Sequence, residues 1–165
     1  VYLQHVAFHK AAPLWRLHKV HHADVDFDAT TGVRFHPVEI GLSMVVKSVV
    51  VCVLGAPVAA VAAFEIALNA TSLFNHGNLA LPERLDGVLR LFLVTPDMHR
   101  VHHSVEPKET DSNFGFCVPW WDRICGTYRQ EPEAGRMGMV VGLGEYQDEP
   151  QQTLVQLLTL PFRRR

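Results

Sequence analysis

One long apolar stretch, residues 40–74, dominates the distribution of hydrophobic residues, and its strongly polar positions are Lys47, Glu65 and Asn69. One membrane crossing needs about 20 apolar residues, so this stretch is too long for a single helix across a bilayer. Gly and Pro at residues 55–57 interrupt it near its middle, and such residues punctuate helices. The pattern therefore predicts two helices joined as a hairpin that crosses the bilayer or dips into it. The alternative is a hairpin buried in a soluble protein.

The segments around this hairpin, which spans about residues 38–74, are more polar and richer in turn residues. Residues 1–23 predict a helix interrupted near Pro13, and residues 24–37 predict a loop. We divide the chain into a histidine-box catalytic core, residues 1–130, and a C-terminal tail, residues 131–165. The expected fold class is all-α: a helical integral membrane protein with a transmembrane or re-entrant hairpin and a histidine-rich helical cap.

Two features of the C-terminal third each allow two interpretations. Trp120 and Trp121 follow Pro119 and suit either the bilayer interface or the protein core, of which the core is the simpler choice. Residues 151–165 predict a short amphipathic helix that ends in three arginines. These arginines either contact anionic lipid headgroups or are solvated as an ordinary tail.

The basic residues indicate an orientation for the hairpin. Of the 15 lysine and arginine residues, only Lys47 lies within it, and the turn at residues 55–57 carries none. Because cytoplasmic loops are enriched in Lys and Arg, both ends of the hairpin are expected on the cytoplasmic side. The histidines that precede and follow the hairpin are then on the same side, as one metal site requires.

Composition supports a membrane protein and gives no support for a nucleic-acid-binding protein, a zinc ribbon or a disulfide-rich domain. A length of 165 residues suits one domain, and a charged fraction of 19% is below the roughly 25% of soluble domains. The net charge of −2 offers no electrostatic argument for nucleic-acid binding. The three cysteines form no CxxC pair, so neither a zinc ribbon nor a disulfide framework is indicated.

Ten histidines, most of them clustered, are the most informative feature of the chain. Side chains three or four residues apart share one face of a helix, so each HxxHH directs two imidazoles toward one point and leaves the third for a second metal or a neighbouring helix. Two copies of HxxHH, one HxxxH and a further histidine exceed the needs of one ion, so two metals are expected. The predicted metal ligands are His5, His9, His18, His21, His22, His76, His99, His102 and His103, with His36 less certain.

Spacing alone does not select the metal. Neutral imidazole binds Zn, Fe, Cu and Ni, and the Glu-x-x-His pairs of soluble di-iron bundles are absent from the sequence. Metal-bound histidines usually donate their second ring N–H to a carboxylate or a carbonyl. The carboxylates near the histidines in sequence are Asp24, Asp26, Asp28, Glu39, Asp97, Glu106 and Asp111.

The histidine motifs and the sequences around them resemble the fatty acid hydroxylase/sterol desaturase superfamily of membrane di-iron enzymes, in particular its bacterial sterol desaturase-like members. The resemblance covers nearly all of residues 2–130, and the segment 142–162 also resembles the end of bacterial members. The motifs that carry it are, in order, HVAFH, LWRLHKVHHAD, TGVRFHPVE, FNHGNLALPERLD, TPDMHRVHHS and ETDSNFGFCVPWWDRICGTYR.

The resemblance implies two iron ions held by these histidines, with the metal cap on the cytosolic face of the membrane. It also implies oxidation of a lipid C–H bond by molecular oxygen, by hydroxylation or desaturation, with sterols and fatty acyl chains among the possible substrates. No catalytic residue beyond the metal centre is expected. Electrons are expected from a separate protein of the reductase, ferredoxin or cytochrome b5 type. Family members have transmembrane helices before the first histidine box, so we expect the chain to be the C-terminal part of a longer protein.

Two other functions are compatible with the same residues. The histidines could hold zinc in a membrane hydrolase, or a metal in a membrane protein without catalytic activity. For an oxygenase, Phe64, Leu68, Leu73 and Phe74 are candidate walls of a lipid cavity, although contact with membrane lipid would explain them equally well.

Overall fold

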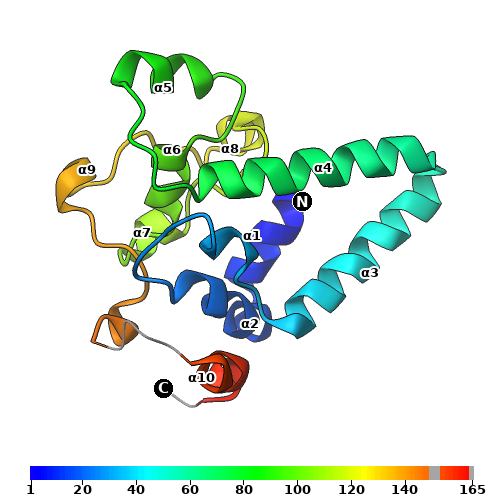
Figure 1. The fold of residues 1–165 in the computed structure, drawn as a ribbon, viewed down its shortest axis with the longest axis horizontal. Helices are drawn as coiled ribbons and strands as arrows, with labels where there is room; N and C mark the ends of the chain where they lie inside the picture. The colour runs from blue at the N-terminus through cyan, green and yellow to red at the C-terminus, as the bar shows by residue number, and fades with distance from the viewer. Residues whose placement is uncertain (149–152, 164–165) are drawn as a thin grey trace.

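The computed structural model describes residues 1–148 and 153–163, and within these residues it contains helices and loops but no β-strand (Figure 1). This confirms the all-α prediction. The elements in chain order are α1 (Tyr2–Lys10), α2 (Ala12–His22), η1 (Thr31–Val33), α3 (Pro37–Leu54), α4 (Val58–Asn75), α5 (Glu83–Leu89), α6 (Pro96–His102), α7 (Pro107–Thr110), α8 (Trp120–Cys125), α9 (Gly135–Gly138), η2 (Gly144–Tyr146), α10 (Leu154–Thr159) and η3 (Leu160–Phe162).

The predicted hairpin is formed by α3 and α4, which diverge from its tip as a V (Figure 1). Pro37 occupies the first turn of α3, where its missing N–H is not needed. Gly55 ends α3 in the left-handed conformation at φ 61°, which glycine adopts without strain. Each helix has 18 residues and is roughly 27 Å long at 1.5 Å per residue, close to the thickness of a hydrocarbon layer.

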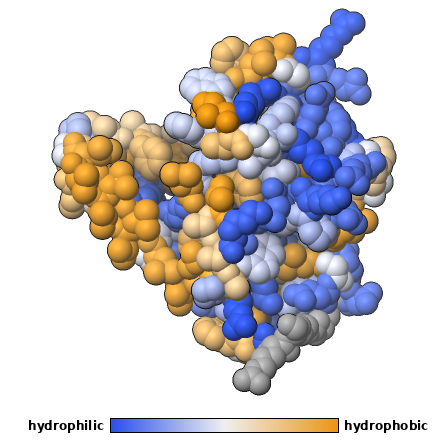
Figure 2. Space-filling model, turned by 180° about the vertical axis from the view of Figure 1, so that it is seen from behind, coloured by the Kyte–Doolittle hydropathy of each residue, from blue (hydrophilic) through white to orange (hydrophobic). Residues whose placement is uncertain are grey.

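The outer surface of the hairpin is apolar and exposed (Figure 2). Only 6% of the α3 window and 11% of the α4 window are buried, and Val53 and Ile66 are 79% and 72% exposed. A hairpin in the core of a soluble protein would be covered by other elements. The exposure therefore favours hydrocarbon contact, and the chain is a helical membrane protein.

The histidine-bearing helices have clear local start and stop signals. The predicted interruption near Pro13 is present, because α1 ends at Lys10, Ala11 is extended, and Pro13 lies in the first turn of α2. The Thr95 side chain accepts a hydrogen bond from the backbone N–H of Met98 and so caps α6.

The described part of the tail packs against α2. Tyr146 and Leu160 form an apolar cluster with Val20 and Ala23. A short helix, α10, is present where an amphipathic helix was predicted, whereas Arg164 and Arg165 lie outside the described residues. The division of the chain at residue 130 stays a prediction.

The expectation that Trp120 and Trp121 are core residues is wrong. They are 50% and 52% exposed, and the indole N–H of Trp120 donates to the carbonyl of Leu91. The buried residue of α8 is Asp122, which accepts hydrogen bonds from the backbone N–H groups of Phe114 and Gly115. Because this carboxylate faces inward, the two tryptophans on α8 face outward.

Candidate metal centre

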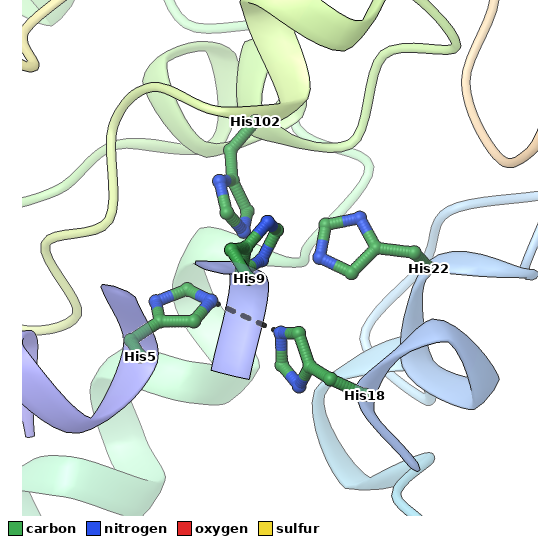
Figure 3. A group of neighbouring side chains, drawn as sticks. All are labelled: His5, His9, His18, His22 and His102. Atoms are coloured by element: carbon green, nitrogen blue, oxygen red, sulfur yellow. Dashed lines mark hydrogen bonds between the residues drawn. The ribbon is translucent and has the colours of Figure 1, made fainter. Parts of the chain in front are cut away.

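Nine of the ten histidines converge on two adjacent positions inside the helical cap. In each group, the ring nitrogens offered by its members lie within 4.8 Å of one another. Nitrogen ligands bind first-row metals at about 2.0–2.1 Å, so ligands on opposite sides of one ion are about 4 Å apart, close to the spacing seen. The five-histidine group comprises His5, His9, His18, His22 and His102, and the four-histidine group comprises His21, His76, His99 and His103 (Figure 3 shows the first).

Both HxxHH motifs divide their histidines between the two groups, as helical geometry predicts. His18 and His22, four residues apart on α2, belong to the five-histidine group, whereas His21 belongs to the other. The α6 motif has the opposite arrangement, since His99 and His103 share the four-histidine group and His102 joins the first. Each helix therefore contributes to both positions and holds them side by side.

The histidines are neutral in this environment. Burial lowers the pKa of His5 and His18 to about 3 and that of His76 to about 4, because a buried imidazolium loses its hydration. Burial, followed by repulsion from neighbouring histidines, also lowers the pKa values of the other six well below the ordinary range. Neutral rings keep one lone pair each, which is the form that binds a metal.

Four of the rings have their orientation set by an outward hydrogen bond. For the three rings that face a backbone carbonyl, Nδ1 must be the donor and Nε2 keeps the lone pair, because a carbonyl oxygen only accepts. These carbonyls belong to Phe114 for His5 (2.8 Å), to Ser112 for His102 (2.7 Å) and to Ser72 for His76 (2.7 Å), and the fourth partner is the carboxyl group of Glu39 for His18 (2.6 Å).

These orientations bring lone pairs together at the centre of each group. The Nε2 atoms of His5 and His18 are 3.1 Å apart, and that of His76 is 3.1 Å from His21 and 3.0 Å from His99. With Nδ1 as donor to a backbone carbonyl, the Nε2 atoms of His5 and His76 carry lone pairs. Further buried ring nitrogens have no hydrogen-bond partner, in His9, His21, His22, His99, His102 and His103. Converging lone pairs need a cation, so the residues fit metal ions.

Aromatic side chains surround the histidines. Phe35 stacks on the ring of His21, with centroids 4.3 Å apart and an angle of 11° between the planes. Phe114 meets His9 edge-on, and Phe27, fully buried, packs against His103. These rings exclude water from the two groups and restrict the rotation of the imidazoles.

Outside both groups lies His36. Its Nδ1 accepts a hydrogen bond from the backbone N–H of Val38, which makes it the N-cap of α3. Its Nε2 then donates to the carbonyl of Leu158 in α10. Both ring nitrogens are engaged in these contacts, so the structure does not bring this less certain candidate to the metal-binding positions.

Sequence reasoning listed seven carboxylates near the histidines without choosing among them. The structure brings Glu39 to 2.6 Å from His18 and places both side chains in the interior. Asp111 lies 3.7 Å from Nδ1 of His9 and is 42% exposed, so its contact is weaker. Glu39 lies three residues after His36 in the first turn of α3. Nothing in the sequence at this position predicts that its carboxyl group contacts His18.

A cavity of about 290 Å³ lies between the two arms of the hairpin and extends to His5, His18 and His21. Among the four predicted wall residues, only Leu68 lines it, whereas Phe64 and Leu73 are exposed on the outside. Several of the other lining residues are polar, which the hydropathy pattern did not predict. The histidines can therefore be reached from the space within the hairpin.

A family model and several curated relatives match the sequence of this chain. The model of the fatty acid hydroxylase family matches residues 1–127, more than half of the chain. The chain belongs to the fatty acid hydroxylase family. This confirms the resemblance at the level of the family, whereas the likeness to sterol desaturases in particular stays a prediction.

The relatives include lipid-modifying enzymes from bacteria and animals. Ornithine lipid hydroxylase OlsE of Rhizobium tropici is 30% identical over 80% of this chain and 39% of its own length. Alkylglycerol monooxygenase of Xenopus tropicalis is 30% identical over 94% of this chain and 33% of its own length. Alkylglycerol monooxygenase of Homo sapiens is 28% identical over 80% of this chain and 28% of its own length. The chain thus spans well under half the length of these relatives. No solved structure matches it.

Proposed function

We propose that this chain forms the di-iron centre of a membrane oxygenase that hydroxylates or desaturates a C–H bond of a lipid. The observation that carries the proposal is the pair of adjacent groups of buried, neutral histidines, with lone pairs directed at two points. Membership of the fatty acid hydroxylase family and the names of the relatives, a lipid hydroxylase and a monooxygenase, support the same chemistry.

Two bound iron ions would supply oxygen activation. Hydroxylation with molecular oxygen consumes two electrons and two protons and releases one water. Desaturation consumes the same electrons and protons, removes two hydrogens from the lipid and releases two waters. We propose that the two electrons come from a separate protein of the reductase, ferredoxin or cytochrome b5 type.

The protein residues have three tasks in this proposal. The outward hydrogen bonds to Glu39 and to backbone carbonyls hold the imidazoles with Nε2 directed inward. Phe27 and Phe114 keep the site dry. The cavity between α3 and α4 brings the lipid to the face of the site formed by His5, His18 and His21. Both hairpin ends lie on the cytoplasmic side, and so does the site.

Metal analysis and isotope labelling test the proposal together. The full-length protein, purified without oxygen and loaded with iron, is expected to hold about two irons per chain. With ¹⁸O₂, a reductant and a lipid extract, it should produce either ¹⁸O-labelled hydroxylated lipid or unsaturated lipid with labelled water. Protein that binds only zinc and hydrolyses lipid esters would overturn the proposal in favour of a zinc hydrolase. Two irons with no oxidised lipid would indicate a metal-binding protein without this activity.

A further inference from the structure

The two arms of the hairpin each turn a row of polar residues toward the cavity. On α3 these residues recur every four positions, and on α4 they recur at intervals of four and three, so each row lies on one helical face. All six line the cavity that reaches His5, His18 and His21. We call them the inner polar stripe: Glu39, Ser43 and Lys47 on α3, and Glu65, Asn69 and Ser72 on α4.

An ion pair occupies the middle of this stripe. The ammonium of Lys47 lies 2.6 and 2.9 Å from the two carboxylate oxygens of Glu65, and the side chains are 31% and 36% exposed. Ionisable residues within membrane-spanning helices are costly, face a cavity or the bundle interior, and often mark a substrate path. The pair faces the cavity, so it fits this rule.

The stripe continues from the ion pair to the metal centre. Ser43 accepts a hydrogen bond of 2.6 Å from Gln4, which belongs to the N-terminal turn of α1 in the opening of the V (Figure 1). Ser72 donates to the carbonyl of Gly32, and the carboxyl group of Glu39 lies 2.6 Å from Nδ1 of His18. Lys47 is eight residues beyond Glu39, about 12 Å along the helix. The polar path from the metal centre to the ion pair is therefore about 12 Å long.

Each side chain of the stripe has a protein partner but can form further hydrogen bonds, and a plain hydrocarbon chain in this cavity would displace water from these remaining donors and acceptors without replacing it. Polar groups that lose water without gaining a hydrogen bond cost free energy, and charged groups cost more. A ligand with hydroxyl, amine, carboxyl or amide groups avoids that cost. The apolar outer faces of α3 and α4 contact membrane lipid instead.

We propose that the cavity binds a lipid through hydrogen-bonding groups that lie within about 12 Å of the oxidised carbon, with the Lys47–Glu65 pair as their anchor. The substrate class is thus a polar lipid oxidised in or close to its polar part, rather than a hydrocarbon chain oxidised far from any polar group. The assignment of a reacting carbon rests on the proposed function. The polar group can be a terminal headgroup or a substituent within the chain, and the two are separated by experiment.

Binding is measured on the iron-loaded, full-length protein kept free of oxygen, so that no turnover is needed. Three probes share one carbon number: an alkylglycerol, a secondary alcohol with its hydroxyl at mid-chain, and the n-alkane. We expect at least one polar probe to bind about tenfold more tightly than the alkane, equivalent to about one good hydrogen bond. Preference for the alkylglycerol identifies a headgroup, and preference for the secondary alcohol identifies a substituent. Equal binding of all three probes overturns the inference.

The anchor is tested with a double substitution, Lys47→Met with Glu65→Leu, which removes both charges without leaving one unpaired. It should weaken binding of the preferred polar probe about tenfold and leave the alkane unchanged or tighter. The matched control, Val45→Met with Ile66→Leu, alters two exposed positions away from the inner polar stripe on the same helices and should change neither. Unchanged polar binding in the first double variant overturns the role of the pair.

If that double variant does not accumulate, the single variant Ser43→Ala is tested instead, because it leaves the ion pair intact. About a threefold loss of affinity for the polar probe supports the inference, and an unchanged affinity overturns it. Admission of oxygen then tests the proposed function separately. A protein that selects the polar probe but never oxidises it keeps this binding site and loses the oxygenase assignment.

Discussion

The histidine core and the hairpin have opposite distributions of polar and apolar residues. In the core, the fully buried large side chains include His21, His22, His76, His99, His102 and His103, and polar residues outnumber apolar ones in the interior. In the hairpin, Val53, Ile66 and their neighbours expose apolar side chains to the surroundings, and the polar stripe faces inward. Neither distribution would be stable in a water-soluble protein without partners.

This contrast shows that each region is complementary to a different environment. Converging imidazole lone pairs suit metal ions, and an outward apolar surface suits hydrocarbon. The cavity connects the two, since it begins within the hairpin and ends at His5 and His18. Substitutions in the histidine core should therefore affect metal content, and substitutions on the outer surface of the hairpin should affect membrane insertion.

The largest effect is expected for His102→Ala, in the core. Removal of this imidazole leaves the five-histidine group without its only ligand from α6. We expect iron bound at this position to be lost and lipid oxidation to fall by at least about a hundredfold, more than the loss of an outer partner costs. Iron content by elemental analysis and product by mass spectrometry measure both. Full activity would remove the site assignment.

His36→Asn is the matched control for that variant. Asn is a favoured N-cap, so α3 should keep its start, and His36 lies outside both histidine groups. Iron content should equal that of the unmodified protein. Loss of one iron in this variant would instead make His36 a ligand.

A charge on the outside of the hairpin tests the other half of the comparison. Ile66→Lys places an ammonium on a surface that is 72% exposed, where we infer contact with lipid. The cost of insertion should be about 3 kcal/mol, or roughly a hundredfold in the partition between membrane and solution. Flotation of membranes measures the partition, and Ile66→Leu is the control. Unchanged partition would mean that this face is not in the hydrocarbon.

The smallest of the three effects is expected for Glu39→Gln. Glu39 belongs to the hairpin helix α3 and contacts His18 in the histidine core. The substitution keeps the size of the side chain but replaces the carboxyl group that contacts Nδ1 of His18 with an amide. We expect iron affinity to fall about 10- to 100-fold without complete loss of binding. Competition with a chelator measures the affinity. Glu106→Gln, an exposed carboxylate near the second HxxHH, should have no effect, and an equal loss in both variants would show that overall charge is responsible.

Features governed by neighbours in the sequence were predictable. Hydropathy with Gly55 and Pro57 located the hairpin to within a residue or two at each end, because helix ends depend on local backbone constraints. The break between α1 and α2 followed from Pro13 in the same way. The HxxHH spacing also predicted that one histidine of each motif would serve a second position, because successive residues on a helix are rotated by about 100°.

Features that depend on contacts between distant segments were not predictable. Which carboxylate meets His18 depends on how α3 packs against α2, and its sequence position did not distinguish Glu39 from six others. The inward face of α8 is set by hydrogen bonds to Asp122 from the segment at Phe114, so the two tryptophans were misplaced. Leu68 lines the cavity and Phe64 does not, although the two lie four residues apart on one helical face, so their spacing in the sequence could not distinguish them.

The sequence alone determined an all-helical membrane protein with a hairpin and a set of clustered histidines, because apolar runs, turn residues and helical spacing act over a few residues. The tertiary structure decided how nine histidines divide into groups of five and four, which atoms orient them, and that the polar residues of the hairpin face a shared cavity. The reason is that these outcomes depend on the packing of segments up to about a hundred residues apart, and no local pattern encodes that packing.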